Sequence, residues 1–217
     1  MSPRGAIFDM DGVLTDSEPL IREAAMTMFR ELGTTVQTAD FEPFVGTGEN
    51  RYIGGVAEKH GMRLDLVEAK RRTYEIYLAL VPLRLTAFPG ACDLVRECRR
   101  RGARVAVASS ADWVKVEANL RQIGLPPTEW DAIVTAEDVE QRKPAPDIFL
   151  AAARRIGLAP ADCTVIEDAV NGVRAAKAAA MRCVAVAQTF PAGLLSEADL
   201  VRPTIGDVCF EDLFPRS

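Results

Sequence analysis

Acidic, hydroxyl and amine side chains follow short apolar runs at several places in this chain. Each run has the composition of a buried β-strand, and the polar groups stand close to where the runs end. The first run, Ala6 to Phe8, leads directly into Asp9, and a second acid, Asp11, comes two residues later. The other members of this pattern are Ser109, Ser110, Lys143, Glu167 and Asp168. Together these groups form a set that can hold a metal ion and transfer a phosphoryl group.

Carboxylates gathered at one place need a cationic partner. They repel one another unless a proton or a hard cation joins them, and Mg²⁺ is the usual cation, keeping water and a substrate phosphate as its remaining ligands. Asp9 and Asp11 project to the same side of an extended chain, while Met10 between them turns away. One carboxylate can then attack phosphorus while the other handles the proton of the leaving group. The pattern therefore predicts Mg²⁺ as the cofactor.

The elements that carry these groups alternate between helix and strand from residue 88 onward. We expect strands at 104–109, 132–134, 164–166 and 183–186, and helices at 90–101, 112–123, 147–156 and 171–180. Almost continuously apolar strands that alternate with helices predict an α/β fold with a doubly wound parallel sheet, covered on both faces. Ligands of such sheets bind beyond the carboxyl ends of the strands, where the polar residues stand.

The residues between Asp16 and Leu85 have a helical pattern throughout. Apolar residues at four-residue intervals predict a helix at 19–32, and two more are expected at 49–60 and at 64–81, the last one ended by Pro82. This stretch is expected to be a helical cap inserted into the sheet domain. The predicted domains are an α/β core of residues 1–16 and 86–217 and a cap of residues 17–85.

Composition excludes several classes of protein. The net charge of −5 gives no basic surface for nucleic acid, and no apolar stretch is long enough for membrane insertion. The five cysteines are odd in number and scattered, so neither a disulfide framework nor a zinc site is indicated. His60, the single histidine, stands at a predicted helix end, which argues against a histidine-dependent triad.

Each candidate residue also has a simpler explanation when it is taken alone. The two acids after the first strand could form a solvated turn, and Lys143 could be an ordinary surface lysine. Ser109 and Ser110 could cap the following helix, as Glu167 and Asp168 could cap the helix that begins near residue 171. The occurrence of all these groups at strand ends, in one chain, favours a common site, although the role of Ser110 stays open.

Four segments resemble the sequence motifs of the haloacid dehalogenase-like phosphohydrolases. They are, in chain order, DMDGVLTDSE (9–18), VASSA (107–111), KPAPDIF (143–149) and VIEDAVNGVRAA (165–176). The resemblance covers nearly the whole chain and is strongest to the beta-phosphoglucomutase and phosphoglycolate phosphatase branch, in which a helical cap follows the first motif.

This resemblance implies a role for each residue. Asp9 would be the nucleophile that forms an aspartyl-phosphate, and Asp11 the general acid and then base. Ser109 and Lys143 would bind the transferring phosphoryl oxygens. Asp9, Asp168 and the backbone carbonyl of Asp11 would hold Mg²⁺, with Glu167 as a further ligand or beside the ligands. The expected reaction is Mg²⁺-dependent hydrolysis of a small phosphomonoester, such as a sugar phosphate or phosphoglycolate.

Three alternatives stay open. Mutase members of this branch carry a histidine, a lysine and an arginine where this chain has Ile21, Val45 and Glu49. A second phosphate would therefore meet no obvious cation there, which makes a mutase the less favoured alternative. The loop at 46–50 is nevertheless expected to face the substrate. A metal-independent dehalogenase is disfavoured by the complete acidic set, and a regulatory domain of a larger assembly, with a protein partner, would keep the fold for binding alone.

Further segments resemble a member of this family that forms a domain of a plant chloroplast protein. They are FVGTGENRYIGGVAEKHG, EIYL, FPGA and CVAVA. This likeness implies the chloroplast stroma for a plant or algal domain, and the cytoplasm for a free-standing bacterial relative.

Overall fold

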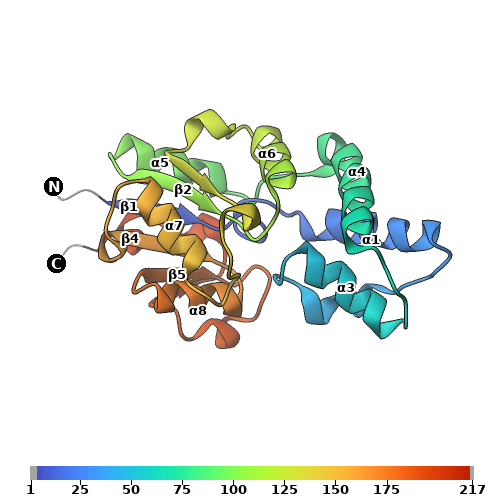
Figure 1. Ribbon diagram of the computed structural model, residues 1–217. Coiled ribbons are helices and arrows are strands. Elements are labelled where there is room, and N and C mark those ends of the chain that lie inside the picture. Colours follow the sequence, from blue (N-terminus) through green and yellow to red (C-terminus); the bar gives the residue numbers. More distant parts are fainter. Residues whose placement is uncertain (1–3, 216–217) are drawn as a thin grey trace.

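A computed structural model describes residues 4–215 of the chain (Figure 1). Its centre is a six-stranded parallel sheet with the strand order β3-β2-β1-β4-β5-β6. The strands are β1 (Gly5–Phe8), β2 (Arg104–Ala108), β3 (Ala132–Val134), β4 (Cys163–Glu167), β5 (Arg182–Val186) and β6 (Leu200–Arg202). The expected α/β class with a parallel sheet is confirmed.

Helices cover both faces of this sheet. The α-helices of the chain are α1 (Glu18–Glu31), α2 (Thr38–Phe41), α3 (Glu49–Lys59), α4 (Leu66–Arg84), α5 (Ala91–Arg100), α6 (Trp113–Gln122), α7 (Asp147–Arg155), α8 (Val170–Ala178) and α9 (Phe210–Leu213). Alternate residues of β1 point to opposite faces, so Phe8 packs with α5, α6 and α9, whereas Ile7 packs with α7 and α8. Two apolar layers therefore enclose β1, which explains why this strand is apolar at every position.

Helices α1 to α4 form a separate apolar cluster beside the sheet (Figure 1). Phe29, Phe41, Ile53 and Tyr77 are fully or almost fully buried in it. The expectation that this helix ends before Pro82 is wrong, because helix α4 continues through the proline to Arg84. Since the proline lies in the last turn, it removes a single helical hydrogen bond and little of the helix depends on it.

The described residues of the helical segment contain no strand, as expected. The division into a core of 1–16 and 86–217 and a cap of 17–85 stays a prediction, and positions 1–3 and 216–217 of that core lie outside the described residues. Strand β6 was not expected, because its three residues are only partly buried and follow no clear apolar run. Within residues 4–215, no helix has the length and apolar character needed to cross a membrane.

The parallel sheet places the residues that follow β1, β2 and β4 at one edge. These three strands are neighbours in the sheet, with Phe8 in register with Val107 on one side and Ile166 on the other. The carboxyl ends of the strands therefore open toward the same side. The helices α1 and α3 lie on that side of the sheet (Figure 1).

Candidate active site

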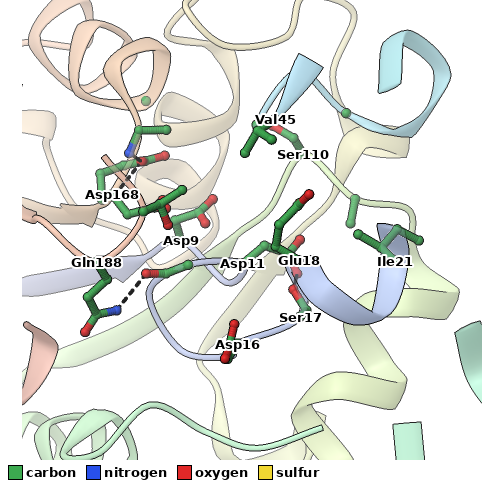
Figure 2. A pocket seen from close by; sticks show the side chains of 18 of the residues that line it. Asp9, Asp11, Asp16, Ser17, Glu18, Ile21, Val45, Ser110, Asp168 and Gln188 are labelled. Carbon is green, nitrogen blue, oxygen red and sulfur yellow. Dashed lines mark hydrogen bonds between the residues drawn. The ribbon is translucent and has the colours of Figure 1, made fainter. Parts of the chain in front are cut away.

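A cavity of about 360 Å³ lies between the carboxyl ends of the strands and the helical segment. This volume suits a small organic molecule. Seven acidic side chains and two lysines line it: Asp9, Asp11, Asp16, Glu18, Glu49, Glu167, Asp168, Lys115 and Lys143. Figure 2 shows Asp9 and Asp168 side by side at one end, with Asp11, Ser17 and Glu18 toward the helical segment. Because negative charge is in strong excess, a phosphate group needs an additional cation in the cavity in order to bind there.

Three carboxylates meet at the end of β1 and β4. Oxygen atoms of Asp9, Glu167 and Asp168 all lie within 4.8 Å of one another, and the three residues are buried. The side chain of Asp11 lies outside this group, and its expected contribution through the backbone carbonyl stays a prediction. The sequence thus indicated the residues that the fold brings together here.

Lys143 is a positively charged partner of this acidic group. Its Nζ donates to Asp9 Oδ1 at 2.5 Å, to Glu167 Oε1 at 2.6 Å and to the carbonyl of Ala108 at 3.3 Å. Burial disfavours the ammonium ion, but the carboxylates of Asp9 and Glu167 outweigh burial and raise the pKa of Lys143. The lysine is therefore a fixed, charged member of the site and not a solvated surface residue.

One ammonium group does not balance three carboxylates. Burial, together with the neighbouring charge of Glu167, raises the pKa of Asp9 to about 7 despite the presence of Lys143. Burial and the charges of Glu167 and Asp9 raise the pKa of Asp168 well above its ordinary value. A second positive charge is what this group lacks, and three buried oxygen donors suit Mg²⁺. The residues fit the expected metal.

Local backbone contacts fix Glu167 in place. Its Oε2 atom accepts hydrogen bonds from the backbone N–H groups of Asp168 at 2.7 Å and Ala169 at 2.8 Å. Helix α8 leaves space for this carboxylate at Gly172, where a Cβ atom would lie 1.8 Å from Glu167 Oε1. The sequence analysis quoted Gly172 inside a motif but gave it no role.

The turn after β1 needs glycine at position 12. Gly12 has a φ of 83°, and a Cβ atom there would lie 2.0 Å from Asp168 Oδ2. Gln188 holds this turn, since its Nε2 donates to the Gly12 carbonyl at 2.7 Å (Figure 2). The turn after β1 and the loop after β4 thus approach closely, which brings Asp168 next to Asp9.

Asp11 is held on the side of the cavity that faces the helices. Its Oδ1 accepts a hydrogen bond from the hydroxyl of Ser17, and its Oδ2 accepts one from Lys115 Nζ at 3.0 Å. The Asp11 side chain is 31% exposed, far more than that of Asp9 at 9%. It is the more accessible of the two acids, as a group that exchanges protons with substrate and water must be.

The two serines after β2 lie in different surroundings. Ser110 lines the cavity. Ser109 is buried, and its Oγ accepts a hydrogen bond from the backbone N–H of Ala111 at 3.2 Å. The phosphate-binding role of Ser109 stays a prediction, as do the other residue roles.

Lys115 was missed by the sequence analysis. It lies on helix α6 with 4% of its side chain exposed, and its Nζ is 3.0 Å from Asp11 Oδ2 and 3.1 Å from Glu49 Oε1. The sequence showed no obvious cation near Ile21, Val45 and Glu49 for a second phosphate, whereas the structure places Lys115 beside Glu49. Ile21, Val45 and Glu49 do line the cavity, and so do Gly46 and Gly48 of the loop that was expected to face the substrate.

A family model described as haloacid dehalogenase-like hydrolase matches residues 3–180. The chain belongs to this family. It is 50% identical over 212 residues to Protein SUPPRESSOR OF QUENCHING 1, chloroplastic, of Arabidopsis thaliana. The match covers 95% of this chain and 20% of that protein, so the chain spans only a small part of this relative. The plant chloroplast likeness expected from the sequence is confirmed.

Two further proteins match along most of their length. The putative phosphatase YhcW of Bacillus subtilis is 33% identical over 195 residues, covering 89% of this chain and 88% of the relative. The crystal structure of CbbY from Rhodobacter sphaeroides in complex with phosphate has a TM-score of 0.84 and 28% identity, covering 94% of this chain and 96% of that chain. The expected hydrolase class and fold are thus confirmed.

Proposed function

We propose that this protein is a Mg²⁺-dependent phosphatase that hydrolyses a small phosphomonoester through an aspartyl-phosphate on Asp9. The observation that carries the proposal is the buried group of Asp9, Glu167 and Asp168 with Lys143, next to an accessible second acid. A relative named as a putative phosphatase and a similar structure that holds phosphate support it. The proposed partner is a small phosphorylated metabolite, in the stroma for a chloroplast protein or in the cytoplasm for a bacterial one.

In the first half of the proposed reaction, a carboxylate oxygen of Asp9 attacks phosphorus. The bond between phosphorus and the ester oxygen breaks, and Asp11 gives its proton to the departing alkoxide. Lys143 is within reach of the attacked group, because it already contacts Asp9, and it neutralises charge on the phosphoryl oxygens together with Ser109.

In the second half, Asp11 takes a proton from water, whose oxygen attacks the aspartyl-phosphate. The bond between Asp9 and phosphorus breaks, and inorganic phosphate leaves. Asp9 and Asp168, with the backbone carbonyl of Asp11 and with Glu167 as a further or adjacent ligand, would hold Mg²⁺, which supplies positive charge to orient the phosphoryl group and stabilise it. Besides the nucleophile Asp9 and the acid–base group Asp11, the proposed reaction needs mainly positioning and charge stabilisation from the protein.

Phosphate release from a panel of phosphomonoesters tests this proposal. Wild-type protein should release phosphate with Mg²⁺ and not with a chelator, and Asp9→Asn should lower the rate by about 1,000-fold or more, since a nucleophile has no substitute. The exposed variant Asp93→Asn is the matched control and should keep its activity. No release by a folded, Mg²⁺-loaded wild-type protein would contradict the proposal and favour a binding role.

A further inference from the structure

Gln188 joins the turn after β1 to the segment that follows β6. Its Nε2 donates to the Gly12 carbonyl at 2.7 Å (Figure 2), and its Oε1 accepts a hydrogen bond from the backbone N–H of Ile205 at 2.7 Å. A carbonyl only accepts and a backbone N–H only donates, so the two partners fix which way the amide faces. Gln188 is 176 positions from Gly12 and 17 from Ile205, and its amide therefore bridges distant parts of the chain.

The end of this bridge at Ile205 is rigid. Ile205 is fully buried in the core. Thr204 and Asp207 form a capping box around it, in which the Thr204 backbone N–H donates to the Asp207 carboxylate at 3.0 Å. Gly206 lies directly against Gly90, where a Cβ atom would be 2.6 Å from Gly206 Cα. The N–H group that orients Gln188 is therefore a fixed point of the structure.

The other end of the bridge adjoins two proposed metal ligands. Gly12 follows Asp11, whose backbone carbonyl is proposed to hold Mg²⁺. Gly12 also lies directly against the carboxylate of Asp168, since a Cβ atom there would be 2.0 Å from Asp168 Oδ2. A shift of this turn would therefore move the Asp11 carbonyl relative to the Asp168 carboxylate, and such a shift requires the hydrogen bond from Gln188 to break.

The remaining acidic side chains of the group are confined as well. Glu167 accepts two backbone hydrogen bonds and lies directly against Gly172, where a Cβ atom would be 1.8 Å from its Oε1. Lys143 is almost fully buried and contacts both Asp9 and Glu167. The protein's own contacts thus hold these oxygen donors in place, and they set the size of the site that a cation would occupy.

A site of fixed size discriminates between Mg²⁺ and Ca²⁺. Mg²⁺ takes oxygen ligands at about 2.0–2.1 Å in a near-ideal octahedron, whereas Ca²⁺ takes roughly six to eight at about 2.3–2.6 Å in variable geometry. A site that cannot expand therefore disfavours the larger ion, and a loosened site loses this preference. Expansion at the turn after β1 is opposed by Gln188, because its anchor at Ile205 cannot follow.

We propose that Gln188 is a positioning residue for the metal site, and that its bridge to Ile205 makes this site select Mg²⁺ over Ca²⁺. Gln188 acts through the turn at Gly12 and is not itself a ligand. The inference rests on the metal site of the proposed function and adds to it the residue that sets its preference between two cations of equal charge.

Calorimetric titration of wild-type and Gln188→Met protein with Mg²⁺ and with Ca²⁺ tests the proposal. Methionine has a similar length but can form neither hydrogen bond of the amide. The affinity for Mg²⁺ should fall about 10-fold or more, and that for Ca²⁺ less than about 3-fold, because Ca²⁺ tolerates displaced ligands. The matched control is Gln122→Met, since Gln122 donates to the Leu85 carbonyl at 3.5 Å and neither residue lines the cavity. This change should leave both affinities unaltered.

The ratio of the two affinities distinguishes positioning from a general loss of structure. A folded Gln188→Met protein that keeps the wild-type ratio, with both affinities unchanged or equally lowered, would overturn the proposal. If this variant does not fold, Gln188→Glu decides, because it keeps the oxygen that accepts from Ile205 and loses only the donor to Gly12. Its added charge attracts both cations alike, so the ratio should again fall, and a wild-type ratio would overturn the proposal.

The metal titrations also separate this inference from the proposed function. The expected change of ratio, together with no phosphate release by wild type, would contradict the phosphatase and retain the role of Gln188. Phosphate release by wild type, together with an unchanged ratio in the variants, would retain the phosphatase and overturn the role of Gln188. Absence of Mg²⁺ binding by wild-type protein would contradict both.

Discussion

A Cβ atom on Gly172 would lie 1.8 Å from Oε1 of Glu167. Gly172 lies inside helix α8 and has an ordinary helical backbone, so the glycine is needed for space and not for a special backbone conformation. The absent side chain leaves room for Glu167, whose other oxygen accepts two backbone hydrogen bonds. The position of this carboxylate therefore depends on a residue with no functional group.

Gly172→Ala should weaken Mg²⁺ binding about 10- to 100-fold, because it displaces Glu167 from the acidic group. The matched control is Gly54→Ala inside helix α3, where a Cβ atom would meet Leu66 at an ordinary 3.4 Å. That change should leave metal affinity unaffected and, as glycine to alanine inside a helix, should not lower helix stability. Titration of Mg²⁺ by calorimetry compares the two variants, and equal affinities would contradict the account.

Mg²⁺ should stabilise the protein against heat through its proposed ligands. At Mg²⁺ concentrations about 100 times the Kd, binding contributes about 2.7 kcal/mol, which corresponds to roughly 5–10 °C in Tm for a chain of this size. Asp168→Asn removes a ligand charge and should abolish most of this shift. Thermal melts with Mg²⁺ and with chelator measure it, and a full shift in the variant would exclude Asp168 as a ligand.

Lys143→Met should destabilise the metal-free protein by about 3–5 kcal/mol, since it leaves Asp9 and Glu167 as buried carboxylates without their ammonium partner. Added Mg²⁺ should restore part of this loss, so the Mg²⁺-dependent rise in Tm should exceed that of wild type. The control is Lys177→Met, whose lysine forms an exposed ion pair with Asp199. Similar melting behaviour of the two variants would argue against a charge-balancing role for Lys143.

The contribution of Asp40 to the free energy of unfolding should depend on pH. The backbone N–H of Gln37 at 2.8 Å, Lys59 at 2.6 Å and His60 at 2.9 Å hold the pKa of this carboxyl well below its usual range. A depressed folded pKa contributes stability that is fully present above the unfolded pKa, about 4, and is lost as pH falls through the folded value.

Urea unfolding of wild type and Asp40→Asn at several pH values tests this. The difference in the free energy of unfolding should be largest near neutral pH and should shrink below about pH 4. Asp93→Asn, at an exposed position, should show no such trend. A difference for Asp40→Asn that stays constant down to strongly acidic pH would contradict the assignment.

The sheet and the acidic group could be predicted because local signals mark them. Asp9, Glu167 and Asp168 stand next to apolar strands, and the parallel arrangement brings strand ends together. The positions of most helices and strands followed from apolar periodicity to within about two residues, which is the usual uncertainty at element ends.

The contacts of Lys115 with Asp11 and Glu49 could not be predicted, because they arise from packing between segments that are distant in the sequence. Lys115 lies on helix α6, 104 positions from Asp11 and 66 from Glu49. The role of Gly172 likewise depends on a side chain that reaches it only in the folded protein. One signal was available, since Lys115 stands beside Val116 and one turn before Asn119 and Leu120, on the face of helix α6 that is buried.

The central claim is that Asp9 becomes phosphorylated, and chemical trapping tests it most directly. Wild-type protein that is turning over a phosphomonoester with Mg²⁺ is quenched in acid and treated with borohydride, which reduces an aspartyl-phosphate to homoserine, and the peptide containing position 9 is analysed by mass spectrometry. Homoserine at position 9, present with substrate and Mg²⁺ and absent with chelator, is the predicted result. Phosphate release in the same samples without modification at position 9, or with modification at another acid, would contradict the account.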